Sequence, residues 1–219
     1  IPTITAVSYL NTIPFVYGLR HADNLRADLL LAPPADCARN YIEGRADIAL
    51  LPAAVVPQLT NTNIITDYCI GAVGAVRTVT VMSNTPIERV KRVWLDPHSR
   101  TSVQLCGYLA RNKWRIAPEW IELGDYSQTE RAAEGDAFLL IGDKVFDYEG
   151  RFRYTYDLAL EWREATQLPF AFAVWVARKG VPYEITDELQ RALTFGVEHI
   201  WEAISESNYM GSDNGITAY

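Results

Sequence analysis

Short apolar runs alternate with segments of helical periodicity along most of the chain. Runs rich in β-branched and aliphatic residues predict buried strands at 4–7, 29–32, 48–51, 93–95, 120–123 and 137–141. Segments typical of helices or helical turns follow most of them, at 11–19, 36–43, 53–59, 101–113 and 127–134. This order of strand and helix favours an α/β fold with parallel strands.

Three longer apolar stretches separate this pattern into two series. The stretches 64–70, 77–83 and 169–177 predict long strands, and a last helix is expected over 186–205 with Thr186 and Asp187 as caps. Two series joined by long strands predict two lobes with a ligand cleft between them.

The predicted lobes are discontinuous along the chain. Lobe 1 is expected to contain 1–83 and 177–219, and lobe 2 to contain 84–176. The chain would cross between them near 77–83 and return near 170–176.

Charge and hydropathy narrow the possible partners. Twenty basic residues stand against 27 acidic ones, for a net charge of −7. A broad nucleic-acid surface needs clustered Lys and Arg, so we expect no nucleic-acid partner. The chain has no apolar run of 18 residues, so we expect no membrane span. A small anionic ligand remains compatible with this balance, because a few local donors suffice to hold it.

The cysteines indicate a reducing compartment. Cys37, Cys69 and Cys106 stand 32 and 37 residues apart, a spacing that suggests neither a zinc site nor a disulfide framework. We expect three buried, reduced thiols. The first residues are typical of a strand rather than a signal peptide, although the chain starts without Met and a removed leader stays an alternative.

Four short segments follow predicted strands and are candidates for a ligand site. In α/β sheets ligands bind beyond the carboxyl ends of the strands. That rule selects 8–12, 51–53, 99–102 and 141–143. The segment 99–102 is the most informative, because three hydroxyls flank the start of a predicted helix, and helix starts present N–H groups to carboxylates or phosphates.

Each candidate also has a simpler interpretation. Ser99 or Thr101 can merely cap the helix, and Arg100 can face solvent. Asn11 could donate to an anion or accept from a hydroxyl, or it could belong to a capped helix start. Asp143, after Gly142, can bind a ligand or cap a turn.

Two further polar residues near these segments receive structural interpretations. Asp96 is interpreted as a turn former. His98 is interpreted as a loop residue, since the sequence identifies no partner carboxylate for it. No nucleotide-binding loop, serine-hydrolase elbow or zinc-protease motif is present.

Five segments together carry a resemblance to a known family. They are 8–14 (SYLNTIP), 44–50 (GRADIAL), 76–79 (VRTV), 95–103 (LDPHSRTSV) and 140–143 (LIGD). In this order they resemble the chorismate dehydratases of the futalosine route to menaquinone. The resemblance implies a periplasmic-binding-protein type II fold used as a cytoplasmic enzyme. It also implies chorismate as the small-molecule substrate, loss of water as the reaction, and no metal or nucleotide cofactor.

The four segments that follow predicted strands contain the expected site residues. We expect Ser8 and Asn11 to be catalytic. The residues expected to bind substrate are Thr12, Pro52, Ser99, Arg100, Thr101, Ser102, Gly142 and Asp143. The chain ends at Tyr219, where the family's usual length would add a further helix.

Two other functions stay open at this point. One is a non-catalytic solute-binding protein for a small carboxylate, built on the same fold. The other is the sister enzyme, 1,4-dihydroxy-6-naphthoate synthase. The sequence makes no prediction of the oligomeric state.

Overall fold

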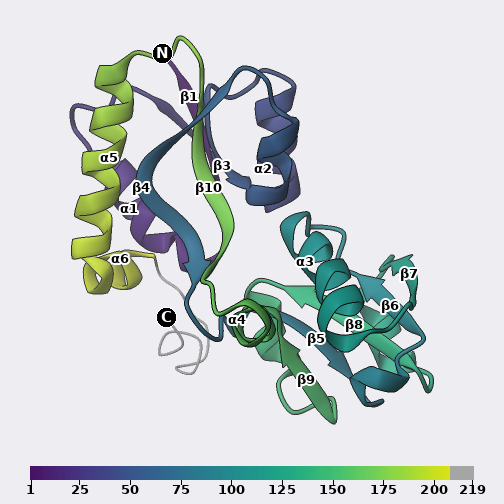
Figure 1. Cartoon of the computed structure of the whole chain (residues 1–219). Helices are drawn as coiled ribbons and strands as arrows, with labels where there is room; N and C mark the ends of the chain where they lie inside the picture. Colours follow the sequence, from purple (N-terminus) through teal and green to yellow (C-terminus); the bar gives the residue numbers. More distant parts are fainter. Residues whose placement is uncertain (208–219) are drawn as a thin grey trace. The chain divides into compact units, whose positions relative to one another are not determined.

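The chain divides into two compact units in the computed structural model, which describes residues 1–207 (Figure 1). Unit 1 contains Ile1–Ile70 and the described residues from Phe172 onward, and unit 2 contains Gly71–Ala171. The sequence-based boundaries at 83 and 177 differ from these, because residues 79–83 pair with strands of unit 2. The end of predicted lobe 1, 208–219, lies outside the described residues.

Unit 1 is built on a five-stranded sheet in the order β2-β1-β3-β10-β4. Its strands are β1 (Thr3–Val7), β2 (Asp28–Ala32), β3 (Ile48–Pro52), β4 (Thr62–Ala72) and β10 (Phe170–Arg178). Its helices are α1 (Ile13–Arg20), α2 (Pro34–Ile42), α5 (Tyr183–Glu198) and α6 (Ile200–Glu206), with short 3₁₀ turns η1 (Leu10–Thr12) and η2 (Ala53–Gln58). β1 runs parallel to β2 and β3, whereas β10 runs antiparallel to β3. The expectation of parallel strands therefore fails for β10.

Both faces of this sheet are buried, which explains the continuous apolar runs of its central strands. Successive side chains of a strand point to opposite faces. Leu50 and Trp175 therefore pack in the cluster that includes α1 and α5, while Leu51 and Val176 pack in the cluster that includes α2. Figure 1 shows α1 and α5 on one side of the sheet and α2 on the other.

Two glycines allow α1 and α5 to touch through their backbones. A Cβ atom added to Gly18 would lie 1.9 Å from the carbonyl oxygen of Ala192. One added to Gly196 would lie 1.9 Å from the carbonyl oxygen of Pro14. No side chain fits at either position, so this helix pair fixes where the segment after β1 begins its helix.

Unit 2 is built on a second five-stranded sheet, in the order β7-β6-β8-β5-β9. Its strands are β5 (Val79–Ser83), β6 (Arg92–Leu95), β7 (Glu119–Glu122), β8 (Asp136–Ile141) and β9 (Tyr154–Asp157). Its helices are α3 (Thr101–Leu109) and α4 (Leu158–Thr166), with a π-helical turn η4 (Ala110–Trp114) and 3₁₀ turns η3 (Ile87–Arg89), η5 (Tyr126–Arg131) and η6 (Asp143–Tyr148). β6 is parallel to β7 and β8, and β5 is antiparallel to β8 and β9.

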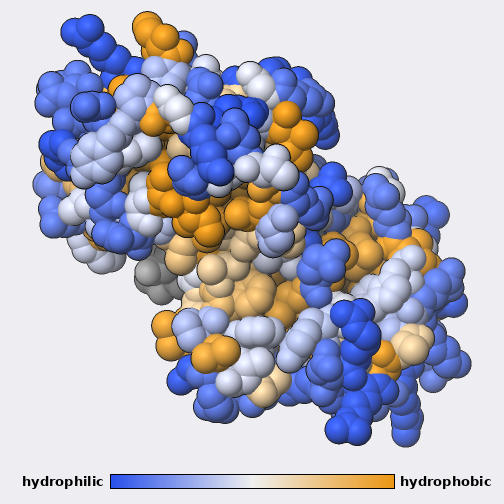
Figure 2. Space-filling model, turned by 45° about the horizontal axis from the view of Figure 1, so that its top comes forward, coloured by the Kyte–Doolittle hydropathy of each residue, from blue (hydrophilic) through white to orange (hydrophobic). Residues whose placement is uncertain are grey.

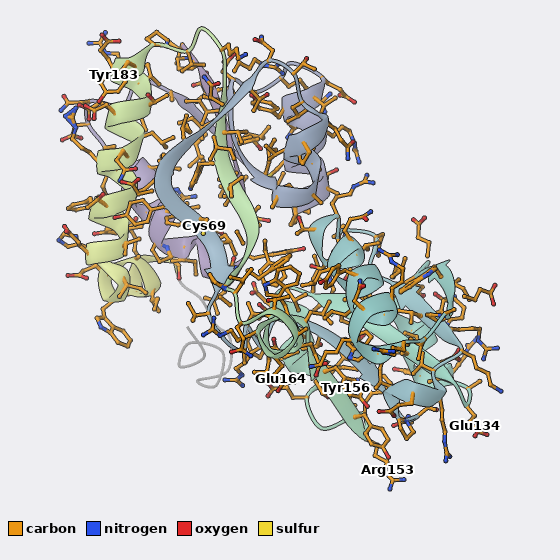
Figure 3. All side chains as sticks on the ribbon, in the orientation of Figure 1. Cys69, Glu134, Arg153, Tyr156, Glu164 and Tyr183 are labelled. Atoms are coloured by element: carbon orange, nitrogen blue, oxygen red, sulfur yellow. The ribbon has the colours of Figure 1, made fainter. Side chains whose placement is uncertain are left out.

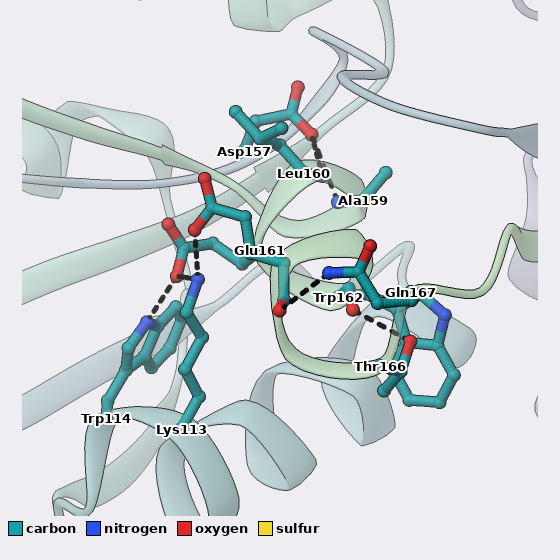
Figure 4. A network of polar contacts seen from close by, with 10 residues as sticks. Lys113, Trp114, Asp157, Ala159, Leu160, Glu161, Trp162, Thr166 and Gln167 are labelled. Atoms are coloured by element: carbon teal, nitrogen blue, oxygen red, sulfur yellow. Dashed lines mark hydrogen bonds and ion pairs between the residues drawn. The ribbon is translucent and has the colours of Figure 1, made fainter.

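Polar contacts hold α4 at its start and at Glu161 within it, as Figure 4 shows. The carboxylate of Asp157 accepts hydrogen bonds from the N–H groups of Ala159 and Leu160 and so caps the helix. The indole Nε1 of Trp114 donates to Glu161 at 2.7 Å, and the ammonium of Lys113 lies 2.7 Å from the same carboxylate. These contacts tie α4 to the end of the α3–η4 segment.

The last long helix differs from its prediction. α5 begins at Tyr183, with Pro182 at the N-cap, and Thr186 and Asp187 lie inside it rather than at its start. Tyr183 marks this start in Figure 3. The helix ends at Glu198, because His199 leaves the helical conformation, and α6 begins at Ile200. The predicted helix over 186–205 is therefore two helices.

Candidate functional site

The segment after β1 provides the candidate residues of unit 1. Ser8 is exposed, and its backbone N–H donates to the carbonyl oxygen of Ala32 on the neighbouring strand at 3.2 Å. Thr12 is fully buried, and its hydroxyl lies 2.5 Å from the carbonyl oxygen of Val7 and 2.6 Å from that of Tyr9. The hydroxyl of Thr12 therefore holds the turn that carries its neighbour Asn11.

Asn11 is the residue of this turn whose side chain can receive a ligand. Its amide oxygen Oδ1 is buried and makes no hydrogen bond within residues 1–207. A buried acceptor without a donor costs about 1–3 kcal/mol. A ligand hydroxyl or N–H at this position would remove that cost, so the turn is arranged to bind a donor.

Pro52 ends β3 and is buried, with Ala173 of β10 as its register partner. It precedes η2 at the N-cap position. Proline has no N–H to donate, so Pro52 can offer a ligand only its ring and its carbonyl group.

The segment after β6 provides the candidate residues of unit 2. Ser99, Thr101 and Ser102 are all buried, with exposed fractions of 7%, 6% and 5%. The N-cap residue of α3 is Arg100, whose exposed side chain makes no capping hydrogen bond. The alternative that Ser99 merely caps the helix is therefore wrong.

Ser99 presents a second unsatisfied polar atom. Its hydroxyl oxygen is buried and has no hydrogen-bond partner in the described part of the chain. It lies one residue before Arg100, the N-cap of α3, and the first N–H groups of this helix have no partner inside it. A buried hydroxyl beside a helix start forms a donor set that suits a carboxylate or a phosphate.

The turn after β8 lies beside this segment through the sheet. Gly142 has a φ angle of 77°, in the left-handed region that glycine adopts easily, and its N–H donates to Thr78 at 2.8 Å. Asp143 is half-buried and opens η6. β8 pairs with β6, so this turn and the segment after β6 leave neighbouring parallel strands at the same edge.

The family of the chain follows from comparison with known proteins. The model of a protein family described as menaquinone biosynthesis matches residues 2–213. The chain belongs to the menaquinone biosynthesis family. Among curated proteins, it is 26% identical over 199 residues to the chorismate dehydratase of Thermus thermophilus, covering 80% of this chain and 69% of that protein. The resemblance predicted from the sequence motifs is thus confirmed at the level of the family.

Solved structures confirm the fold class predicted for this member of the menaquinone biosynthesis family. Protein AF1704 from Archaeoglobus fulgidus is similar with a TM-score of 0.76 and 17% identity, covering 99% of this chain and 85% of that one. YhfZ from Shigella flexneri follows with a TM-score of 0.64 and 16% identity, covering 97% and 94%. The cysteine-binding protein from Campylobacter jejuni has a TM-score of 0.53 and 13% identity, covering 97% and 92%. The fold is α/β and of the periplasmic-binding-protein type II kind.

Sequence reasoning missed the most buried charged group of unit 2. Asp96 is 1% exposed, and its carboxylate accepts hydrogen bonds from the N–H groups of His98 at 3.0 Å and Ile141 at 3.2 Å. It also accepts from the hydroxyl of Tyr126 at 3.1 Å and lies 2.9 Å from the ammonium of Lys144. Asp96 is therefore more than a turn former, because it joins three turns of the sheet edge.

His98 likewise has partners that the sequence did not reveal. Its Nδ1 lies 3.4 Å from the hydroxyl of Tyr126 and 3.7 Å from the carboxylate of Asp96. An aspartate directly after a buried strand was a usable signal for such a group. Tyr126 and Lys144 carry no signal in their local sequence, since only the sheet brings them to Asp96.

The cysteines are all free, but one prediction about them is wrong. Cys37 and Cys106 are buried, whereas Cys69 is exposed on β4 (Figure 3). Burial raises the pKa of the Cys37 thiol to about 11 and that of Cys106 to about 12. Neither buried thiol is therefore available as a thiolate nucleophile at neutral pH.

Two other kinds of feature are absent from residues 1–207. No group of three or more His, Cys, Asp or Glu side chains in this range could hold a metal ion. No helix in the same range is long and apolar enough to cross a membrane. On the face drawn in Figure 2, hydrophilic residues predominate and hydrophobic ones reach the surface in several places.

Proposed function

We propose that this member of the menaquinone biosynthesis family is a chorismate dehydratase, a carbon–oxygen lyase of the futalosine pathway. It would remove water from chorismate and release 3-[(1-carboxyvinyl)oxy]benzoate, and it would act in the cytoplasm. The observation that carries the proposal is that two of the buried, unpartnered polar atoms, Asn11 Oδ1 in unit 1 and Ser99 Oγ in unit 2, each lie on a segment that follows a sheet strand. The name of the Thermus thermophilus relative supports the choice of substrate.

The reaction requires little from the protein beyond orienting the substrate and assisting the transfer of a proton. Chorismate is a dianion that carries a hydroxyl at C4 and a hydrogen at C3. Removal of the C3 proton leaves an electron pair that forms the new ring double bond, while the C4–O bond breaks and the oxygen leaves as water. Because the ring becomes aromatic, positioning and charge stabilisation suffice as the protein's contribution.

Each candidate residue receives a role in this proposal. Ser99, Thr101 and Ser102 would bind one carboxylate at the start of α3, with Arg100, Gly142 and Asp143 near the same sheet edge. Asn11 and Ser8 would hold the reacting edge of the ring, with Asn11 bonded to the departing hydroxyl. The substrate's own enolpyruvyl carboxylate would accept the C3 proton and pass it to the departing C4 hydroxyl, which leaves as water. Thr12 would support Asn11 through its turn, and Pro52 would pack against the ring.

A direct assay tests the proposed reaction. The purified protein is mixed with chorismate, and the mixture is followed by liquid chromatography with mass spectrometry. We expect the loss of one water and an aromatic ultraviolet spectrum. Binding without turnover would favour a solute-binding protein, and turnover of a cyclic futalosine derivative instead would favour the sister naphthoate synthase.

A pair of variants tests the assignment of Asn11. Asn11→Ala should lower kcat by about 100-fold or more, as expected when a single polar group that stabilises the transition state is removed. His98→Ala should change kcat far less, because the substrate itself is proposed to accept the proton. Steady-state kinetics of both variants decide the matter. Equal losses, or an inactive His98 variant that still binds chorismate, would contradict the assignment.

A further inference from the structure

The buried carboxylate of Asp96 brings a negative charge close to the 99–102 segment. The carbonyl oxygen of Asp96 accepts a hydrogen bond from the N–H of Ser99 at 3.1 Å, and its carboxylate accepts one from His98. The charge of Asp96 therefore lies within one turn of the hydroxyls that are proposed to bind a carboxylate. Away from water, two negative charges at such a separation repel each other strongly.

Lys144 is the group that carries a permanent opposite charge to this carboxylate. The other hydrogen-bond donors to Asp96 are two backbone N–H groups and the hydroxyl of Tyr126, all of them neutral, and His98 Nδ1, 3.7 Å away, is charged only when protonated. The Lys144 ammonium lies 2.9 Å from Asp96 Oδ2, and it also lies over the ring of Tyr126, 4.7 Å from its centroid. The Asp96 side chain is fully buried, and that of Lys144 is 23% exposed.

We propose that Lys144 is a positioning residue that neutralises Asp96 and thereby allows the 99–102 segment to bind a carboxylate. The hydrogen bonds of Asp96 hold the 99–102 segment in place. The positive charge of Lys144 compensates the negative charge that the Asp96 carboxylate brings close to this segment. The inference rests on the proposed function for its choice of ligand. It adds a residue that the sequence motifs did not single out.

Three variants and one control test the proposal by calorimetric titration with chorismate, each made in a protein that carries Asn11→Ala so that little chorismate is converted during the measurement. Lys144→Gln should weaken binding by about tenfold or more, because Asp96 then stays charged without compensation. Lys144→Arg should bind within about threefold of the original protein, since it keeps the charge. The double variant Asp96→Asn with Lys144→Gln should recover most of the lost affinity, because no charge is left to compensate.

Lys113→Gln is the matched control. Its ammonium also contacts carboxylates, those of Glu161 and Glu164, at 2.7 and 2.6 Å, and its side chain is 24% exposed (Figure 4). It belongs to the α4 network rather than to the turn after β6. Its replacement should leave the chorismate affinity unchanged, and thermal unfolding of every variant checks that it is folded.

The outcomes separate the two claims. If the double variant binds no better than Lys144→Gln, Lys144 contacts the ligand directly and the proposal is overturned. It is also overturned if Lys144→Gln binds as well as the original protein. If the protein without substitutions binds chorismate but does not convert it, the proposed function alone is contradicted, because the affinities still test Lys144. If chorismate does not bind, 3-hydroxybenzoate is titrated in the same series, and a protein that binds neither contradicts both claims.

Discussion

The two units are stabilised by different kinds of contact. In unit 1, apolar clusters cover both faces of the sheet, and α1 meets α5 through backbone at Gly18 and Gly196. In unit 2, three aspartates, Asp96, Asp136 and Asp157, each accept several hydrogen bonds from separate segments. A change in side-chain volume should therefore act most on unit 1, and a change in charge should act most on unit 2.

The largest effect is expected at Gly196, where unit 1 has no space for a side chain. Gly196→Ala would place a methyl group 1.9 Å from the carbonyl oxygen of Pro14, so α1 and α5 must move apart. We expect a loss of about 3 kcal/mol or more in the free energy of unfolding. Urea unfolding followed by circular dichroism measures this loss.

Gly107→Ala is the control for this substitution. Gly107 lies in α3, and an added Cβ would meet only the Arg111 side chain, at 3.6 Å. Alanine favours a helix interior over glycine, so this change should stabilise unit 2 by about 0.5–1 kcal/mol. If both variants behave alike, backbone contact between α1 and α5 is not what limits unit 1.

A smaller loss is expected from removing a carboxylate of unit 2. Asp157→Ala removes the cap of α4 and also the acceptor for the N–H groups of Val76 and Arg77, at 2.9 and 2.5 Å. A lost cap costs about 1 kcal/mol, and the two further N–H groups bring the total to about 2–3 kcal/mol. Thermal and urea unfolding measure it.

Asp125→Ala separates the two roles of Asp157. Asp125 caps η5 through Ser127 but holds no distant segment. Its replacement should cost less than that of Asp157. Equal losses would mean that the contacts to Val76 and Arg77 contribute nothing.

The smallest expected effect is a change in pH dependence. Burial raises the pKa of Asp136, but the hydrogen bonds from Arg92 and from the N–H of Ala133 outweigh it and leave this pKa below its ordinary value. Asp136 therefore stabilises the folded chain above an ordinary aspartate pKa of about 3.9, and this stabilisation is lost as the pH falls through the lowered value.

Asp136→Asn tests that dependence. The variant should be less stable at pH 7, and its free energy of unfolding should fall less steeply on acidification between about pH 5 and pH 2. Urea unfolding at several pH values provides the comparison. If the free energy of unfolding falls equally steeply with pH in both proteins, Asp136 does not contribute to the pH dependence of stability.

The buried strands could be predicted because their signal is local. β3 is a continuous apolar run, as is β8 after Asp136, and β1 is interrupted only by threonines, which is typical of strands buried on both faces. β9 and α4 were not predicted, and α4 buries only Leu158 and Ala159. Its start depends on Asp157, whose partners at Val76 and Arg77 lie about 80 residues earlier. The antiparallel direction of β5 and β10 likewise depends on pairing across the sheet.

In the candidate site, too, some residues could be predicted from the local sequence and others could not. The hydroxyls of 99–102 could be selected because the strand–helix order marks the segment, and the burial of Ser99 agrees with a ligand-facing role. Tyr126 and Lys144 could not be selected, since they reach Asp96 from turns 30 and 48 residues away. The unpartnered Asn11 oxygen is also invisible in sequence, because it results from the turn that Thr12 closes.

The pairing of β4 with β10 has a consequence for how this gene can be cut and joined. These strands are neighbours in the sheet of unit 1, and they carry the chain away from unit 1 and back to it. Unit 2 is thus an insertion between two neighbouring strands, and domains inserted at neighbouring positions tolerate excision and transplantation. Residues 71–171 form a natural cassette, and a short linker between β4 and β10 would close unit 1 without them.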